Sequence, residues 1–182
     1  MYSKLCTKIE RVIDAIVLSS NTENLVHDVN LGTLASITSG KRPIISKGGM
    51  YEIIGANGKT GMTDSWNVRP ESIITGRVGT IGKFHRVESF SWASDNSLVI
   101  SSKYHTYLLS YLRQNFLTAS IVKGSTQPLV TQTDLSQTTI KVPTNIEDVE
   151  NRLEKLDSAI MYIHKKQNAA LEIKNLLLSK YF

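Results

Sequence analysis

The chain is poor in cysteine and in long apolar runs. It has one cysteine, Cys6, among 182 residues, so no intrachain disulfide can form and the cytoplasm is the expected compartment. No run approaches the roughly 18 to 20 apolar residues that a membrane span needs. The N-terminus also lacks the long apolar stretch of a signal peptide. These absences argue against a disulfide-stapled scaffold and predict no membrane partner.

The positive charge is confined to one part of the chain. The whole sequence has a net charge of +5, with 41% hydrophobic residues, a composition typical of globular proteins. Residues 31–145 hold 12 basic and 6 acidic residues, a net charge of +6, whereas the flanking segments are close to neutral. This distribution permits a nucleic-acid partner, and an ordinary basic surface is the alternative.

Three segments differ in their hydrophobic periodicity. Residues 2–18 carry one apolar stripe at helical spacing, with the helix expected to end at 19–22. Residues 21–145 hold every glycine and proline, and they contain short strand-like runs at 51–54, 72–75, 97–100 and 139–142. Helices are predicted there at 31–37 and 104–116. We therefore predict an α+β fold: a short N-terminal helix (1–20), a mixed α/β domain (21–145) and a long C-terminal helix (146–182).

The C-terminal segment predicts a long one-sided helix. It has no glycine or proline, and about 33 residues would span roughly 50 Å. Its apolar residues first follow a heptad pattern, which then weakens. Two partners remain open for this stripe: the chain's own N-terminal helix, or a second polypeptide. The predicted interface residues are Ile146, Val149, Leu153, Leu156, Ile160, Ile163, Ile173 and Leu177.

Motifs for catalysis or metal binding fail on inspection. The run at 55–60 lacks the first glycine of a phosphate-binding loop, and the glycines at 76–82 have the wrong spacing for a dinucleotide site. The four histidines lack metal-ligand spacing. No catalytic constellation is assembled by sequence. We therefore expect no enzyme activity and no bound cofactor or metal.

Four stretches, in order, resemble the specificity subunits of Type I restriction-modification systems. They are SGKRP at 39–43, IIGANG at 53–58, IITGRVGTIG at 73–82 and GSTQP at 124–128, and the long helix follows them. The resemblance implies a non-catalytic subunit that reads one half of a bipartite DNA site and docks methyltransferase subunits through its helices. It also implies a bacterial or archaeal source, S-adenosylmethionine on the partner methyltransferase, and a possible restriction subunit.

This chain departs from the family pattern in two ways. A full-length subunit carries two recognition domains separated by two long antiparallel helices, whereas this chain shows one such domain and an additional N-terminal helix. The resemblance therefore implies that two copies pair as a homodimer, or that the chain is a fragment. An alternative is a regulatory partner that competes for methyltransferase subunits without reading DNA.

Candidate DNA-binding residues follow from charge, hydrogen-bonding groups and loop position. Phosphates attract basic side chains and supply affinity, whereas base edges are read by Arg, Asn or Gln. By analogy with the family, the glycine-rich stretches are scaffold or phosphate clamps, and base readers lie at 59–72 and 83–93. For 125–127, a turn held by its own side chains is an equal alternative. The candidates are Lys41, Arg42, Lys47, Asn57, Lys59, Trp66, Arg69, Arg77, Lys83, His85, Arg86, Ser125, Thr126 and Gln127.

Overall fold

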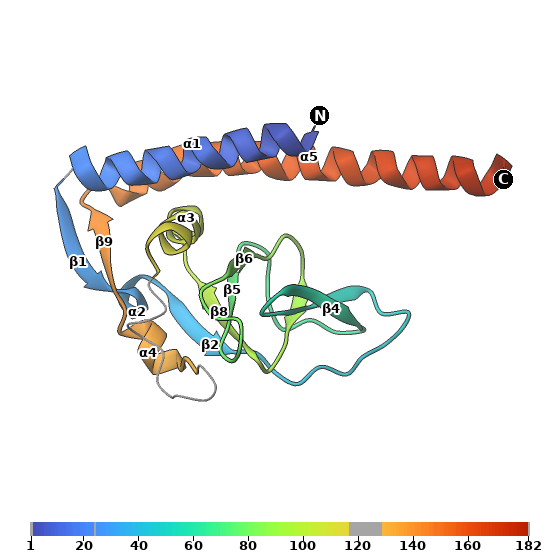
Figure 1. Cartoon of the computed structure of the whole chain (residues 1–182), viewed down its shortest axis with the longest axis horizontal. Coiled ribbons are helices and arrows are strands. Elements are labelled where there is room, and N and C mark those ends of the chain that lie inside the picture. Colours follow the sequence, from blue (N-terminus) through green and yellow to red (C-terminus); the bar gives the residue numbers. More distant parts are fainter. Residues whose placement is uncertain (1, 24, 117–128, 182) are drawn as a thin grey trace.

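Two antiparallel helices lie along one side of a mixed α/β domain (Figure 1). The computed structural model describes residues 2–23, 25–116 and 129–181. Helix α1 spans Tyr2–Glu23 and helix α5 spans Ile146–Tyr181, and the two pack against each other. The far end of α5 runs past the N-terminus of α1 (Figure 1). The α+β prediction, with a helix at each end of the domain, is confirmed.

The described strands form three small sheets. Strand β1 (Val26–Asn30) pairs antiparallel with β9 (Thr139–Pro143) directly below the two helices. The second sheet has the order β2-β8-β5-β6 and is antiparallel throughout, and the third has the order β4-β3-β7, with β3 and β7 parallel. The bounds are β2 Ser36–Ser39, β3 Tyr51–Gly55, β4 Gly58–Thr63, β5 Ile73–Gly76, β6 Phe84–Arg86, β7 Ser91–Ala93 and β8 Ser97–Ser101.

Helix α3 (His105–Asn115) lies between the helix pair and the four-stranded sheet (Figure 1). Its Tyr107 and Leu108 are fully buried in the main core, which also takes side chains from α1, α5 and the sheet. Successive side chains of β5 point to opposite faces of the sheet. Ile73 therefore belongs to this main core, whereas Ile74 belongs to a second, smaller core on the other face. The short helices α2 (Leu31–Leu34) and α4 (Gln132–Ser136) close the domain beside β2.

The heptad stripe of α5 is largely buried within the chain, so of the two partners left open for it the structure shows the chain's own helices. The main core includes Ile146, Val149, Leu153 and Ile160, and Leu156 and Ile163 pack against its edge. The physical reason is that α1 and α3 both lie against this face of α5. Only the last two predicted interface residues, Ile173 and Leu177, remain exposed. The chain's own helices are therefore the partner of the heptad stripe.

Other elements differ from their predicted bounds in instructive ways. Helix α1 continues through the polar run at 19–22, where the side chains bond back to carbonyls three or four residues earlier and do not cap the helix, as in the bond from Asn21 Nδ2 to Val17 O. The predicted helix at 31–37 divides into α2 and β2. The four predicted strands are present within a residue of their expected bounds. None of the described helices has the length and hydrophobicity needed to cross a membrane.

Candidate nucleic-acid interface

Three of the four glycine-containing stretches meet around one turn. Residues 94–96 connect β7 to β8, and together with Ser97, the first residue of β8, their backbone bonds to all three stretches. Gly40 N donates to Ser97 O at 3.0 Å, and Arg77 N donates to Asn96 O at 2.9 Å. Ser94 N donates to Ile54 O at 3.0 Å, which brings in the stretch at 53–58. Segments far apart in sequence therefore form one end of the domain.

Glycine is required where these backbones approach each other. A Cβ atom on Gly40 would lie 2.0 Å from Ser94 O, and one on Gly76 would lie 2.1 Å from Thr80 O. Neither position has room for a side chain, so these glycines act as scaffold. The fourth stretch, with Ser125, Thr126 and Gln127, lies outside the described residues. The chain that follows it reaches the same end, where Val130 N donates to Arg77 O at 2.9 Å.

The structure divides the predicted DNA contacts by exposure. Two of the three half-buried candidates are held by other parts of the protein: His85 Nε2 hydrogen-bonds to Ala56 O at 3.0 Å, and Arg86 forms an ion pair. Arg77 is also half-buried. The remaining described candidates are exposed and available to a ligand: Lys41, Arg42, Lys47, Asn57, Lys59, Trp66, Arg69 and Lys83. Among them, Lys59 pairs with Glu52 at 2.6 Å.

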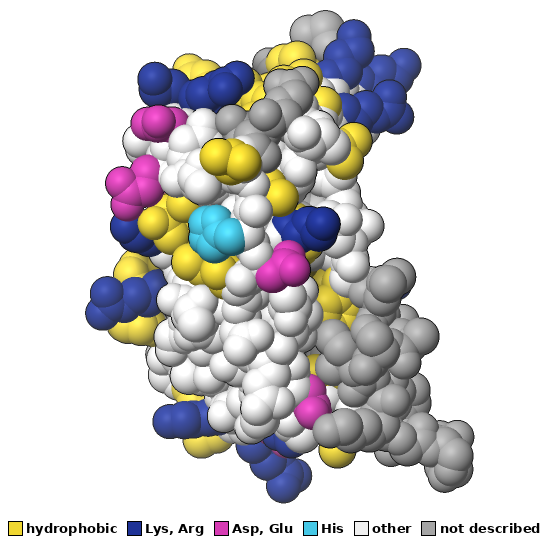
Figure 2. Space-filling view, turned by 90° about the vertical axis from the view of Figure 1, so that its left-hand side faces the viewer, with side chains coloured by type: hydrophobic (Ala, Val, Ile, Leu, Met, Phe, Trp, Pro, Cys, Tyr) yellow, Lys and Arg dark blue, Asp and Glu magenta, His cyan; other side chains and the backbone are white. Residues whose placement is uncertain are grey.

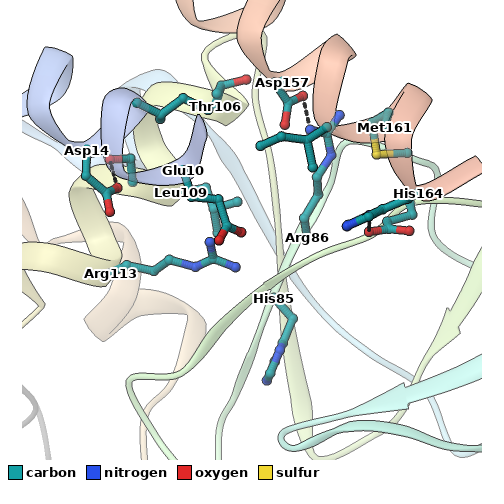
Figure 3. Close-up of a pocket in the computed structure, with 14 residues that line it drawn as sticks. Glu10, Asp14, His85, Arg86, Thr106, Leu109, Arg113, Asp157, Met161 and His164 are labelled. Carbon is teal, nitrogen blue, oxygen red and sulfur yellow. Dashed lines mark hydrogen bonds and ion pairs between the residues drawn. The ribbon is translucent and has the colours of Figure 1, made fainter. Parts of the chain in front are cut away.

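Arg86 differs from its predicted role as a base reader. Its guanidinium pairs with Asp157 of α5, and both side chains are nearly buried (Figure 3). Burial lowers the pKa of Arg86, and nearby Glu71 and Glu88 counteract that effect. Since the side chain points toward the helix pair and is held there, it fixes the end of β6 to α5 and is not presented to DNA.

A cavity of about 210 Å³ lies beside this ion pair, among α1, α3, α5 and β6. Figure 3 shows acidic side chains from α1, among them Asp14, facing Arg113 of α3 across the space. Asp14 accepts a hydrogen bond from Ser110 at 2.7 Å, and Arg113 Nε donates to Phe84 O at 3.1 Å. The first bond joins α1 to α3, and the second joins α3 to β6 of the sheet.

Glu150 of α5 caps the N-terminus of α3. Its two carboxylate oxygens accept from Thr106 N and Tyr107 N, both at 2.8 Å, and the residue is 3% exposed. Burial raises the pKa of Glu150, and the backbone bonds oppose that rise. Burial lowers the pKa of neighbouring His105, whose Nδ1 lies 3.8 Å from Glu150.

One group has the composition of a metal site. The potential ligand atoms of His105, Glu150 and Glu154 lie within 4.8 Å of one another. Both oxygens of Glu150 already accept backbone N–H groups, so we assign this carboxylate to helix capping. Sequence spacing did not reveal the group, because 45 and 49 positions separate His105 from the two glutamates.

Sequence reasoning missed an exposed apolar pair, Ile44 and Ile45, in the irregular segment between β2 and β3. These side chains are 82% and 72% exposed. Basic residues flank them, and they follow the first glycine-containing stretch directly. The signal available in the sequence was an apolar dipeptide placed inside a basic, non-periodic segment.

The end of the molecule formed by β1 and β9 differs in character. In Figure 2 its face is mainly uncharged, and most of its Lys and Arg side chains lie toward the margin. The exposed predicted contacts on β4 and the β2–β3 segment belong to the opposite part of the domain (Figure 1). The candidate nucleic-acid interface is therefore this opposite part, with the convergent glycine-containing turns.

The chain belongs to the family of Type I restriction modification DNA specificity domains. The family profile matches residues 25–173, which include the whole mixed domain and most of α5. The resemblance stated from the four stretches is thereby confirmed. A comparison with curated proteins finds no match.

Solved structures show the same fold. The S subunit of a Type I restriction-modification system from M. genitalium matches with a TM-score of 0.66 and 16% identity, over 87% of this chain and 45% of that one. The HsdS subunit from Thermoanaerobacter tengcongensis matches with a TM-score of 0.53 and 15% identity, over 90% of this chain and 48% of that one. A chain from a structural study of type I R-M complex assembly matches with a TM-score of 0.56 and 14% identity, over 97% of this chain and 51% of that one. This chain thus spans about half the length of these neighbours.

Proposed function

We propose that this chain is a DNA-reading specificity component that binds one half of a bipartite site. The observation that carries the proposal is the meeting of the family's glycine-containing stretches at one end of a domain that displays exposed cations. Lys41 and Arg42 follow one such glycine, and Lys83 follows another. Rigid turns that carry cations suit phosphate contacts, which set the register of a reader on its duplex.

The proposal is tested by measuring binding of the full chain to duplex DNA over a salt series. Phosphate contacts release counterions, so log affinity should fall linearly with log salt, with a slope of about −0.9 per contact. A specificity component should also show sequence preference that persists when salt is raised. A flat salt response without sequence preference would contradict the proposal and favour a competitor that only occupies methyltransferase subunits.

We propose further that the distal part of α5 mediates pairing of two copies and docking of methyltransferase subunits. Its exposed apolar side chains lie where α5 extends beyond α1: Leu171, Ile173, Leu176, Leu177 and Leu178, each 47–69% exposed. At 36 residues, α5 is about 54 Å long. Two copies related by a two-fold axis would read an interrupted palindrome.

The pairing is tested by sedimentation of the full chain and of I173S/L177S. The variant should become monomeric while the domain stays folded, because both side chains lie outside the core. Sequencing of the methylated site, in cells that carry the chain and a methyltransferase partner, provides an independent check. An asymmetric bipartite site would rule out the homodimer. The methyl transfer, with S-adenosylmethionine, and any restriction belong to partner subunits in this proposal.

A further inference from the structure

Ile44 and Ile45 form an exposed apolar pair on the domain. Side chains of this size are usually at least partly covered, and adjacent exposed ones mark an interaction site more often than scattered ones do. These two are 82% and 72% exposed, and they lie in the segment between β2 and β3, which Figure 1 draws in cyan. Their exposure indicates a binding site for a ligand that covers two apolar side chains.

The backbone holds the pair in place on both sides. Before it, Lys41 N donates to Ala93 O at 3.0 Å, and Trp92 Nε1 donates to Lys41 O at 2.7 Å. After it, Ser46 N donates to Met62 O at 2.9 Å. Pro43 fixes the backbone immediately before the pair. The pair is therefore presented between two fixed points and needs little ordering on binding.

A second close approach tightens the far end of the segment. A Cβ on Gly49 would lie 2.4 Å from Thr63 O, so only glycine permits this contact with β4. Gly49 N also donates to Ser46 O at 3.2 Å. The segment is thus attached to β7 at one end and to β4 at the other.

Charge identifies the ligand. Residues 39–51 contain three cations, Lys41, Arg42 and Lys47, all exposed, and no acidic residue. An apolar pair flanked by cations matches a nucleic-acid groove, where phosphates lie on both sides of stacked bases. An anionic lipid surface also suits an apolar pair flanked by cations, and the chain's membership of a family of DNA specificity domains decides between the two. The combination favours duplex DNA.

We propose that Ile44 and Ile45 are an apolar wedge that enters the minor groove and partly unstacks one base step, while the flanking cations hold the phosphates. This inference rests on the proposed DNA-reading function and adds the means of recognition. Apolar wedges kink duplexes from the minor groove, and flexible pyrimidine–purine steps kink most easily. The wedge would therefore contribute specificity through deformability, without hydrogen bonds to base edges.

The test compares the full chain with I44S/I45S and with the control L25S. Leu25 is 82% exposed and lies at the junction of α1 and β1, at the other end of the molecule. A library of 30-bp random duplexes is selected with each protein. The wild-type chain and L25S should enrich sites with a TA or CA step at a constant position. The I44S/I45S variant should lose that preference.

Affinity and bending are then measured on a duplex selected by the wild-type chain and labelled at both ends for energy transfer. The I44S/I45S variant should bind about tenfold more weakly and bend the duplex less. Its salt slope should match that of the wild-type chain, because no charge is removed. Its urea midpoint should also be unchanged, since neither side chain is in the core.

A measurement on the wild-type complex keeps the test independent of the variant. 2-Aminopurine placed at the enriched step should brighten on binding, because unstacking relieves its quenching. No brightening, or equal binding and bending by I44S/I45S, would overturn the wedge while leaving the DNA-reading function intact. Absence of any salt-dependent DNA binding by the wild-type chain would instead overturn the proposed function.

Discussion

Replacing Glu150 with alanine should destabilise the whole domain, because this carboxylate joins α5 to the N-terminus of α3. The substitution leaves the buried N–H groups of Thr106 and Tyr107 without their acceptors. Bonds to a charged group contribute about 1.5–3 kcal/mol each. The carboxylate itself is costly to bury, which is the reason that its pKa is raised. With that offset, we expect a loss of about 3 kcal/mol in the free energy of unfolding.

Urea unfolding followed by circular dichroism measures this loss. With a slope of about 2 kcal/mol per molar, the midpoint should fall by about 1.5 M. E150Q keeps one acceptor oxygen and should lose less. The matched control is E147A, three residues earlier on α5, because the Glu147 side chain is 68% exposed where it pairs with Lys103. E147A should unfold like the wild-type chain. If E150A did so too, the capping role would be refuted.

Three further predictions concern packing, pH and DNA. G40A should lower the free energy of unfolding by about 2 kcal/mol, because its Cβ would overlap Ser94 O. The control G48A should have no effect, because the space around Gly48 is open. Thermal melts compare the two variants. H105Q should flatten the pH dependence of stability below pH 6.5. Burial lowers the pKa of His105, so between the lowered pKa and pH 6.5 the unfolded chain binds more protons than the folded one. The stability that is present above pH 6.5 is therefore lost as the pH falls toward the lowered pKa. Urea midpoints of H105Q and the wild-type chain from pH 5 to 7 test the difference. K41A/R42A should weaken binding on all duplexes alike and reduce the salt slope by about 1.8, and a loss confined to selected sites would make these residues base readers.

The β-rich runs were predictable where apolar, β-branched residues cluster. Strands β5 and β8 have that composition, and the sequence predicts both within a residue. Strands β1 and β4, with the sequences VHDVN and GKTGMT, lack it and were not predicted. Their pairing depends on partners elsewhere in the chain: β9 for β1, and β3 for β4. Local composition does not contain that information.

The heptad stripe of α5 was also predictable only in part. Spacing alone identified the apolar face of α5, including Leu153, which is fully buried. Spacing says which face is covered and does not say what covers it. The covering elements, α1 and α3, come from segments that precede α5 by tens to more than a hundred positions in the sequence.

The candidate interface was predictable where cations sit in glycine-containing turns. Lys41, Arg42 and Lys83 were selected on that ground and are exposed. Arg86 was selected from the predicted base-reading loop at 83–93, but it lies on β6 and its partner Asp157 lies 71 positions away on α5. Ile44 was missed because an apolar residue is normally assigned to a core. Its exposure is a property of the folded segment and of its anchors on both sides.

The pairing of β1 with β9 has a consequence for how the chain folds. Val26 and Pro143 are partners although they lie 117 positions apart, so closing this loop has an entropic cost. Helices α1 and α5 resemble a helical hairpin in shape, yet they flank the entire mixed domain. Their contact is therefore non-local, and we predict that it forms slowly, as in proteins of high contact order. Until then, the apolar face of α5 remains uncovered.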